Sequence, residues 1–325
     1  ETHLFVTNTA GSVDRFYVCM NRPASSSGPL PLCIMLHGGG GHASSSLAAV
    51  PVNNLPDGEE AIGMAIDYGT GHTGDQIALH TLYGDPVPAS YSDSPDPDEE
   101  VLYRDMIGFQ RILDHLINTG VADPDRIAVF GTSWGGFRTM LWAGLDDRID
   151  AAAISPGGGG MRGNPGLIGT QVANIPEPMR ERWYQEFDPL AHADQVSAPL
   201  YVEAPSNDRW FYPLDIQACM DAMPSNPRWV VVPNNDHGAG HAHYSQDGAQ
   251  PFLMNAIFGE VTWPAIDDDS FYALGSSWRW ETVNGDAVSS ALYFSPGSDL
   301  ETPARYWVEV PATRSGGVWM AALPE

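Results

Sequence analysis

The chain has 325 residues, enough to bury a full core in one large α/β domain and to add a small accessory module. Its net charge is −26 and all 15 basic residues are arginine, so its surface is a poor partner for nucleic acids and anionic membranes. No apolar run approaches the roughly 18 residues needed to cross a bilayer, which argues against membrane insertion.

Two features bear on the compartment and the redox state. The chain as given opens with Glu1, and residues 1–10 already alternate like a strand, so we expect no signal peptide within it. Localisation stays open, and secretion or a periplasmic location is compatible with the sequence. The three cysteines, Cys19, Cys33 and Cys219, are too few and too scattered for a disulfide framework, so we expect buried free thiols.

The first part of the chain predicts strands that feed a glycine-rich loop. Residues 3–8 and 14–20 alternate as an opening hairpin would. The apolar run 32–36 ends at the sequence HGGGGH of residues 37–42, as a buried strand leading into a functional loop would. Residues 61–68 form the next predicted strand.

Strands and helices then alternate. After a surface loop at 84–98, one helical face over 99–118 carries Leu102, Met106, Phe109, Leu113 and Leu116. Gly120 predicts its end, and the chain then turns into a strand at 127–130. Further strands are predicted at 151–155, 200–204 and 229–233. This order predicts an α/β fold with a mostly parallel sheet and helices on both faces.

The motif Gly131-Thr132-Ser133-Trp134-Gly135 matches G-x-S-x-G. It follows an apolar strand and precedes a helix-forming stretch, which is the strand–turn–helix setting of a nucleophile elbow. Flanking glycines permit the strained turn and close helix packing, and they leave the serine hydroxyl exposed at a helix N-terminus. The sequence therefore predicts Ser133 as a nucleophile.

A serine nucleophile needs a histidine base and an orienting carboxylate, which follow it in the order Ser, Asp, His in this fold. Asp208 lies in the loop after the strand 200–204, and His237 lies in the loop after the strand 229–233. Because the carboxyl ends of parallel strands meet at one edge of the sheet, we expect Ser133, Asp208 and His237 to form a catalytic triad.

Backbone amides must also bind the oxyanion that develops during acyl transfer. We expect them from Trp134, the residue after the nucleophile, and from Gly39 and Gly40 in the glycine-rich loop. The substrate pocket is expected to include His37, Trp183 and Trp210. The mechanism needs neither a metal nor an organic cofactor.

The regions after the elbow differ in character. Residues 157–187 are too irregular for one strand–helix unit and predict a cap over the pocket. The tail is rich in strand patterns, with a Ser-Gly-Gly turn at 315–317. We therefore expect a catalytic domain at 1–262 and a small all-β, sandwich-like module at 263–325.

A zinc site is the alternative explanation for the cluster of His237, His241 and His243. The first two would share one helical face at i, i+4. However, the HExxH pattern is absent, and Gly238 and Gly240 argue against a helix, so the triad is the favoured interpretation.

At these residues the chain resembles the α/β-hydrolases of the prolyl oligopeptidase and acetyl xylan esterase type. The stretch VFGTSWGGFRTMLWAGLDDRIDAAAIS is similar to their elbow, helix and following strand, and PLYVEAPSNDRWFYPLD to their acid-bearing strand and loop. The resemblance covers roughly residues 30–260 and implies the same triad. The tail is similar to a small immunoglobulin-like module of some relatives, although such modules usually carry more strands.

The sequence predicts a serine esterase that cleaves carboxylic esters of small molecules through an acyl-enzyme, acetylated carbohydrates among them. A prolyl oligopeptidase-like peptidase or amidase would use the same triad, but the β-propeller that precedes the hydrolase domain in the peptidase branch is absent from the chain as given. A third hypothesis is a non-catalytic carbohydrate-binding protein, suggested by the tryptophans of the tail.

Overall fold

The structure is a computed structural model that divides into two compact units, Glu1–Phe258 and Gly259–Glu325, which are described separately. It describes residues 2–9, 12–24, 26, 28–39, 41–47, 50, 55, 59–68, 101–225, 227–237, 248–259, 265–267, 270–283, 287, 289–295 and 306–323.

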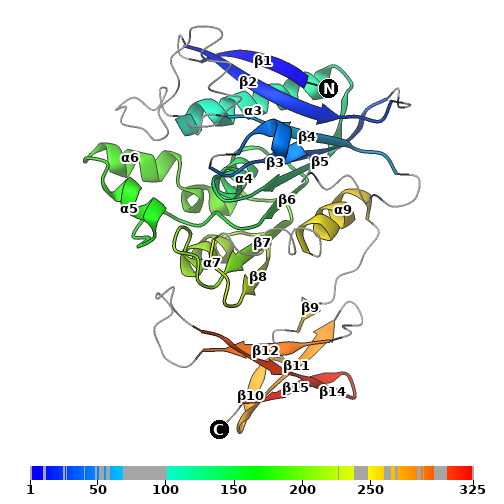
Figure 1. Ribbon diagram of the computed structural model, residues 1–325, viewed down its shortest axis with the longest axis vertical. Helices are drawn as coiled ribbons and strands as arrows, with labels where there is room; N and C mark the ends of the chain where they lie inside the picture. The colour runs from blue at the N-terminus through cyan, green and yellow to red at the C-terminus, as the bar shows by residue number, and fades with distance from the viewer. Residues whose placement is uncertain are drawn as a thin grey trace. The chain divides into compact units, whose positions relative to one another are not determined.

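The first unit is built on an eight-stranded sheet in the order β1-β2-β4-β3-β5-β6-β7-β8 (Figure 1). Its strands are β1 Thr2–Thr9, β2 Ser12–Asn21, β3 Leu30–Leu36, β4 Ile62–Ile66, β5 Ala122–Gly131, β6 Ala151–Ile154, β7 Leu200–Pro205 and β8 Arg228–Val232. β1 pairs antiparallel with β2, and β2 with β4, whereas all strands from β4 onward are parallel. The predicted hairpin, parallel sheet and α/β class are confirmed.

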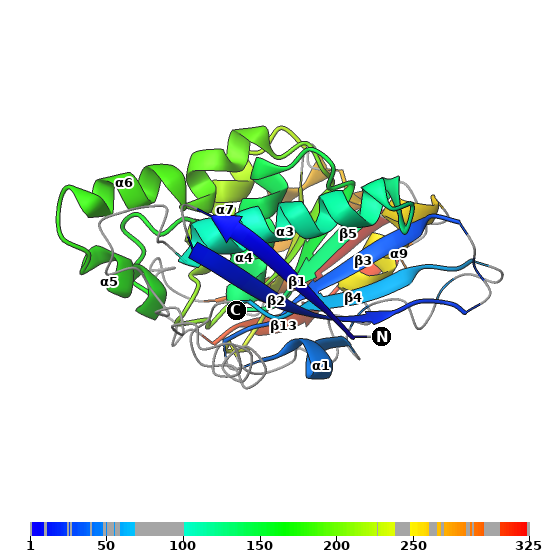
Figure 2. The same cartoon turned by 90° about the horizontal axis from the view of Figure 1, so that it is seen from above.

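Helices cover both faces of this sheet. They are α1 Ala43–Ser46, α3 Val101–Asn118, α4 Trp134–Leu145, α5 Leu167–Ala173, α6 Met179–Glu186, the 3-10 helix η3 Pro189–Gln195, α7 Pro213–Asp221 and α9 Gln250–Phe258. Figure 2 shows α3 and α1 on opposite sides of the strands β3 and β4. On the face of α9, Tyr201 of β7 stacks on Phe252, with ring centroids 5.4 Å apart.

The main core fills the face covered by α3, α4 and α7. Alternate residues of each parallel strand, such as Ile34 on β3 and Val129 on β5, pack there against Phe109 of α3 and Trp142 of α4. These four side chains are at most 1% exposed. Because both faces of a parallel sheet are buried, its strands read as continuous apolar runs, which is why the sequence located them.

Helix α3 ends as its sequence predicts. Gly120 has a φ of 69°, in the left-handed region that favours glycine. Its N–H donates to Ile117 O at 2.9 Å, and Val121 N donates to Leu116 O at 2.9 Å, which together make a Schellman motif. One boundary differs from the prediction: β5 begins at Ala122 and not at Ile127, because Ala122 pairs with Leu30 before a register shift.

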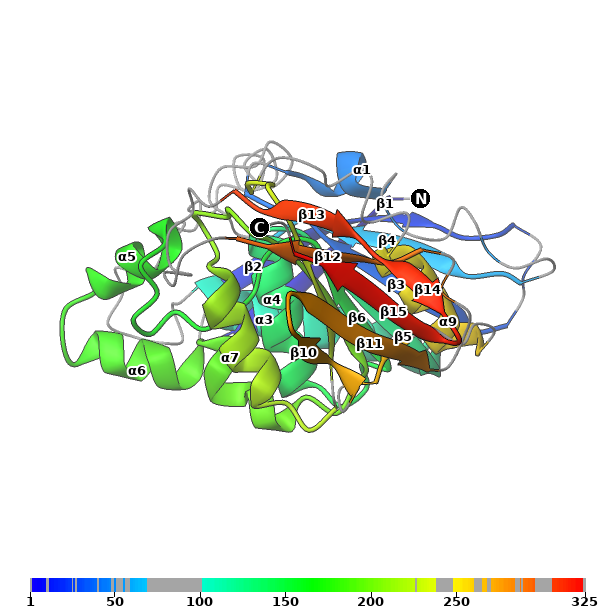
Figure 3. The same ribbon diagram turned by 90° about the horizontal axis from the view of Figure 1, so that it is seen from below.

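The second unit is all β, as predicted for the tail. Its larger sheet has the order β10-β11-β15-β14, formed by Tyr272–Leu274, Ser277–Val283, Val318–Ala322 and Thr313–Ser315, and β9 Ala265–Ile266 also pairs with β11. A second sheet pairs β12 Ala291–Phe294 with β13 Val308–Pro311. Figure 3 shows these strands from below. Trp280, Trp319 and Ala321 form the buried core of this unit.

Two further predictions concern membrane-spanning helices and the cysteines. Within the part of the chain that the structure describes, no helix combines the length and apolar character required to traverse a bilayer. Cys19, Cys33 and Cys219 are buried free thiols, as predicted. Burial raises the pKa of Cys33 to about 12 and raises that of Cys219 well above its ordinary value.

Candidate active site

Ser133 lies on a strained turn between β5 and α4. Its φ of 55° and ψ of −119° are rare for a residue with a side chain, and such strain is typical of functional sites. The main chain approaches itself closely at this turn because Gly131 and Gly135 have no side chain. A Cβ at Gly131 would collide with Gly135 O, and one at Gly135 would collide with Leu36 O. Ser133 is partly exposed at the N-terminus of α4, where the helix dipole favours negative charge.

Ser133, His237 and Asp208 form a continuous hydrogen-bonded chain. His237 Nδ1 lies 2.8 Å from Asp208 Oδ2, and His237 Nε2 lies 2.8 Å from Ser133 Oγ. A carboxylate accepts hydrogen bonds, so the histidine proton sits on Nδ1 and Nε2 accepts from the serine hydroxyl. This arrangement can take the proton of Ser133 during attack on an acyl group.

Asp208 is fixed by the loop that carries it. The carboxylate is buried, and its second oxygen, Oδ1, accepts from Trp210 N at 2.8 Å and Phe211 N at 3.1 Å. Phe211 also stacks on the His237 ring, with centroids 5.6 Å apart. Oδ2 therefore remains to accept from His237 Nδ1. The contacts of Phe211 with Asp208 and His237 were not predicted from the sequence.

The glycine-rich loop after β3 lies beside Ser133. A Cβ at Gly38 would stand 3.0 Å from Ser133 Cβ, and one at Gly39 would stand 3.4 Å from Trp134 Cδ1. Thr132 N donates to Leu36 O at 3.2 Å, which joins the end of β3 to the elbow. The structure thus brings Gly39 and Trp134 to the nucleophile, whereas Gly40 lies outside the described residues.

A second glycine-rich loop, residues 157–160, supports the elbow from the end of β6. It is buried, and Ser133 N donates to the carbonyl of Pro156 just before it. Asp188 holds the loop's far end, because its carboxylate accepts from Met161 N at 2.8 Å and Arg162 N at 3.1 Å. Burial raises the pKa of Asp188, and these backbone bonds oppose the rise.

The three predicted pocket residues have different surroundings. Trp210 is partly buried, and its ring centroid lies 6.0 Å from that of His237. Trp183 is instead 6% exposed and stacks on Phe137 of α4, so it belongs to the core. His37 is also buried, and its ring lies against Asp67 and Tyr68. It therefore supports the glycine-rich loop, and the prediction that it lines the substrate pocket is corrected.

The segment predicted as a cap, residues 157–187, contains α5 and α6, and η3 follows it. It is tied to the loop of Asp208, because Leu167 N at the start of α5 donates to Arg209 O at 3.0 Å. Arg162 and Glu181 form a bidentate pair with distances of 2.7 and 2.8 Å that links the preceding loop to α6. This segment therefore lies beside the acid loop.

The alternative zinc site would use His237, His241 and His243. Of these, His241 and His243 lie outside the described residues. Among the residues that are described, no group of three or more His, Cys, Asp or Glu side chains has the arrangement of metal ligands.

Parts of this chain are similar to known proteins. A family model described as the prolyl oligopeptidase family matches residues 100–254, a range that contains Ser133, Asp208 and His237. Dipeptidyl aminopeptidase BIII of Pseudoxanthomonas mexicana is 24% identical over 204 residues, 56% of this chain and 26% of that protein. The chain thus spans about a quarter of the length of this curated relative.

Solved structures share the fold. Acetyl xylan esterase from Paenibacillus sp. R4 matches with a TM-score of 0.60 and 19% identity, covering 78% of this chain and 87% of that chain. A puromycin-hydrolyzing peptidase of Mycobacterium tuberculosis matches with a TM-score of 0.55 and 21% identity, covering 79% and 40%. The chain therefore has the α/β-hydrolase fold and resembles serine hydrolases of the prolyl oligopeptidase and acetyl xylan esterase type.

Proposed function

We propose that the protein is an esterase that cleaves carboxylic esters with Ser133 as nucleophile, His237 as general base and Asp208 as the residue that orients His237. The observation that carries the proposal is the hydrogen-bonded chain from Ser133 Oγ through His237 to Asp208, with both distances at 2.8 Å. In the reaction, His237 Nε2 takes the serine proton as Ser133 Oγ bonds to the acyl carbon. The same histidine then gives that proton to the leaving alcohol.

The oxyanion would be bound by backbone amides of Trp134, Gly39 and Gly40. Gly39 and Trp134 approach each other across the elbow, which supports this role for the first two. The N-terminus of α4 adds a favourable field for negative charge at Ser133. Water then attacks the acyl-enzyme, with His237 again acting as base.

The choice of an ester follows the esterases that share this fold. The acetyl xylan esterases from Paenibacillus sp. R4 and Thermoanaerobacterium sp. JW/SL YS485 match this chain with TM-scores of 0.60 and 0.56. Small acyl esters, including acetylated sugars, are therefore the proposed substrate class.

Peptidase or amidase activity is the second candidate, because the matching family model and the curated relative are peptidases. The two candidates are separated by turnover of a nitrophenyl ester and of the matched nitroanilide with the same acyl group. We expect turnover of the ester to exceed that of the anilide by far. An anilide cleaved as fast as the ester would favour the peptidase.

The role of Ser133 is tested with a fluorophosphonate probe and the Ser133→Ala variant. We expect the wild type to be labelled and the variant not, with turnover lower by several orders of magnitude and an unchanged melting temperature, because a partly exposed hydroxyl contributes little to packing. A variant that keeps a tenth of the activity would contradict the proposal. An unlabelled, inactive wild type would instead favour a non-catalytic binding protein.

A further inference from the structure

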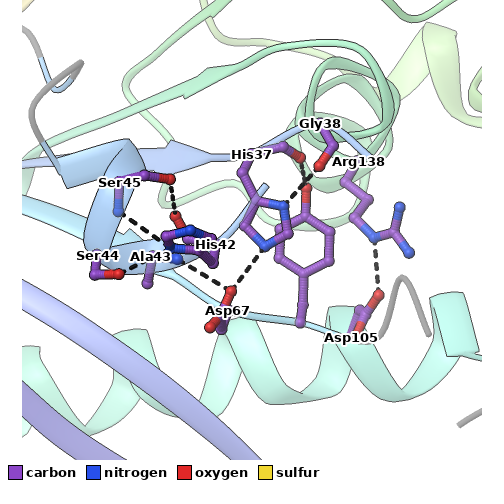
Figure 4. A network of polar contacts seen from close by, with 10 residues as sticks. His37, Gly38, His42, Ala43, Ser44, Ser45, Asp67, Asp105 and Arg138 are labelled. Carbon is purple, nitrogen blue, oxygen red and sulfur yellow. Dashed lines mark hydrogen bonds and ion pairs between the residues drawn. The ribbon is translucent and has the colours of Figure 1, made fainter. Parts of the chain in front are cut away.

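A cluster of buried side chains lies next to the glycine-rich loop, and Figure 4 shows its members His37, Asp67, Asp105 and Arg138. These residues surround Tyr68, the second residue after β4, whose side chain is fully buried. Tyr68 belongs neither to the triad nor to the predicted substrate pocket. Its contacts reach the two segments that carry the proposed oxyanion donors.

The Tyr68 hydroxyl is bonded to the main chain of the glycine-rich loop. It donates to the carbonyl of His37, the residue directly before Gly38. Burial raises the pKa of Tyr68 well above its ordinary value, and the nearby Arg138 only partly opposes the rise, so the hydroxyl keeps the proton that it donates. The main chain is thus held from the end of β4 at a point two residues before Gly39.

The two faces of the Tyr68 ring contact different segments. The His37 ring stacks on it, with centroids 4.2 Å apart and planes 5° from parallel. Arg138 Cζ of α4 lies 4.5 Å from the centroid of the same ring. Two groups this close to one centroid cannot share a face, so His37 and Arg138 lie on opposite faces. Tyr68 therefore acts as a spacer, one ring thick, between the glycine-rich loop and α4.

Arg138 is fixed on the side of the elbow. Its Nε donates to Asp105 Oδ2 of α3 at 2.8 Å, and both side chains are 3% exposed. Its Nη1 lies 3.5 Å from Trp134 O, and its Cζ lies 5.7 Å from the centroid of the Trp134 ring. The guanidinium thus lies between the rings of Tyr68 and Trp134, and a shift of Tyr68 would be transmitted to the residue after the nucleophile.

These contacts bear on the reaction because Gly39 and Trp134 are the proposed oxyanion donors that the structure describes. Tyr68 holds His37 O on the side of Gly39, and it packs on Arg138 on the side of Trp134. The two donors already approach each other, since a Cβ at Gly39 would stand 3.4 Å from Trp134 Cδ1. An oxyanion hole lowers the barrier only when its amides are fixed before the reaction begins.

We propose that Tyr68 is a positioning residue for the oxyanion hole, whose hydroxyl and ring together set the distance between the amides of Gly39 and Trp134. Because its side chain is fully buried, Tyr68 acts through these residues and not on the substrate. The proposal rests on the catalytic role of Ser133. It holds for an ester and for an amide alike, because both pass through an oxyanion.

The proposal is tested with Tyr68→Phe, which removes the hydroxyl and keeps the ring. We expect kcat for a nitrophenyl ester to fall about tenfold or more while KM changes less than about twofold, because the hole binds the transition state more tightly than the substrate. A trifluoromethyl ketone is the second probe, since its adduct with Ser133 places a charged oxygen in the hole. Its affinity should fall by a factor similar to that in kcat.

Tyr201→Phe is the matched control. Tyr201 is 8% exposed, and its hydroxyl donates to the buried Glu203 at 3.1 Å. Each variant removes one buried tyrosine hydroxyl, but Tyr201 stacks on Phe252 on the other face of the sheet. Melting temperatures report any general loss of stability in both variants. We expect Tyr201→Phe to keep the wild-type kcat and the wild-type affinity for the ketone.

The proposal is wrong if Tyr68→Phe loses no more kcat than Tyr201→Phe, or if kcat falls while the affinity for the ketone is unchanged. A wild type that reacts with the fluorophosphonate but turns over no ester would contradict the proposed esterase alone. The labelling rate of Tyr68→Phe, expected to fall below that of Tyr201→Phe, would then test the positioning role. A wild type that does not react with the fluorophosphonate would overturn both proposals.

Discussion

The described part of the first unit contains two close histidine–aspartate pairs, and they differ in what the second ring nitrogen faces. In the pair of His237 and Asp208, the histidine side chain is 18% exposed and its other nitrogen, Nε2, faces the hydroxyl of Ser133. In the pair of His37 and Asp67, the histidine is almost fully buried and its other nitrogen faces a carbonyl. A hydroxyl can give up its proton and a carbonyl cannot. The same residue types therefore suit proton transfer in one place and support in the other.

The largest expected effect is on the exposed pair. His237→Ala removes the only base that contacts Ser133 Oγ among the described residues, so turnover of a nitrophenyl ester should fall by about 10⁴-fold or more. His241→Ala and His243→Ala should reduce turnover only modestly, and a strong chelator should change nothing. If His241→Ala abolishes turnover and His237→Ala does not, the general base is His241. Activity that is lost to the chelator and restored by zinc would contradict the triad.

Asp208→Asn comes next. Asparagine can still accept from Trp210 N and Phe211 N, so the loop should stay folded while His237 loses its orienting charge. By analogy with other triads the loss in kcat is up to about 10⁴-fold. A variant that keeps the wild-type kcat with the same ester would contradict the role of Asp208.

A smaller effect is expected at Trp210, whose partly exposed ring lies beside the His237 ring. If Trp210 lines the substrate pocket, as we propose from its place beside His237, Trp210→Ala should raise KM for an aromatic ester several-fold and change kcat less. Trp183→Ala is the contrasting variant: it opens a cavity against Phe137 and should cost about 3–5 kcal/mol of stability. A Trp183 variant with altered KM and normal stability would place it in the pocket.

The smallest expected effect concerns the burial of the Cys33 thiol. Cys33 lies on β3, four residues before His37, and burial raises the pKa of its thiol to about 12 from 9.0. A group whose pKa is raised by folding stabilises the protein below its unfolded value, so this contribution is lost as pH rises from 9 toward 12. Native protein should therefore resist iodoacetamide at pH 8, and urea-unfolded protein should react; mass spectrometry of the labelled peptide checks this.

The sequence located the parts of the site that have local signals. Ser133 stands in a strand–turn–helix pattern, and Asp208 and His237 each follow an apolar strand, so chain order and strand ends were enough to bring them together. The pair of His37 and Asp67 has no such signal, because 30 residues separate its members and only the pairing of β3 with β4 joins them. Sequence alone assigned His37 to the pocket for that reason.

Other misassignments have the same cause. Trp183 sits on a short amphipathic helix whose aromatic face could meet either a pocket or a core, and only packing on Phe137 decides. In the second unit the strand β11 was not identified. Its Arg279 and Glu281 alternate with Trp278 and Trp280, because one face of that small sheet packs on the three-residue core and the other does not.

The glycines of the elbow also limit how far related sequences can diverge. At Gly131, Gly135 and Gly157 an added methyl group would strike main-chain oxygen, and no rotamer change can move it aside. Alanine at any of these positions must shift β3, the elbow or the end of β6. Descendants of this chain can exchange surface acids freely, so their overall identity can fall while these three positions stay glycine. Distant relatives are therefore better detected by the spacing of 131, 135 and 157 than by overall similarity.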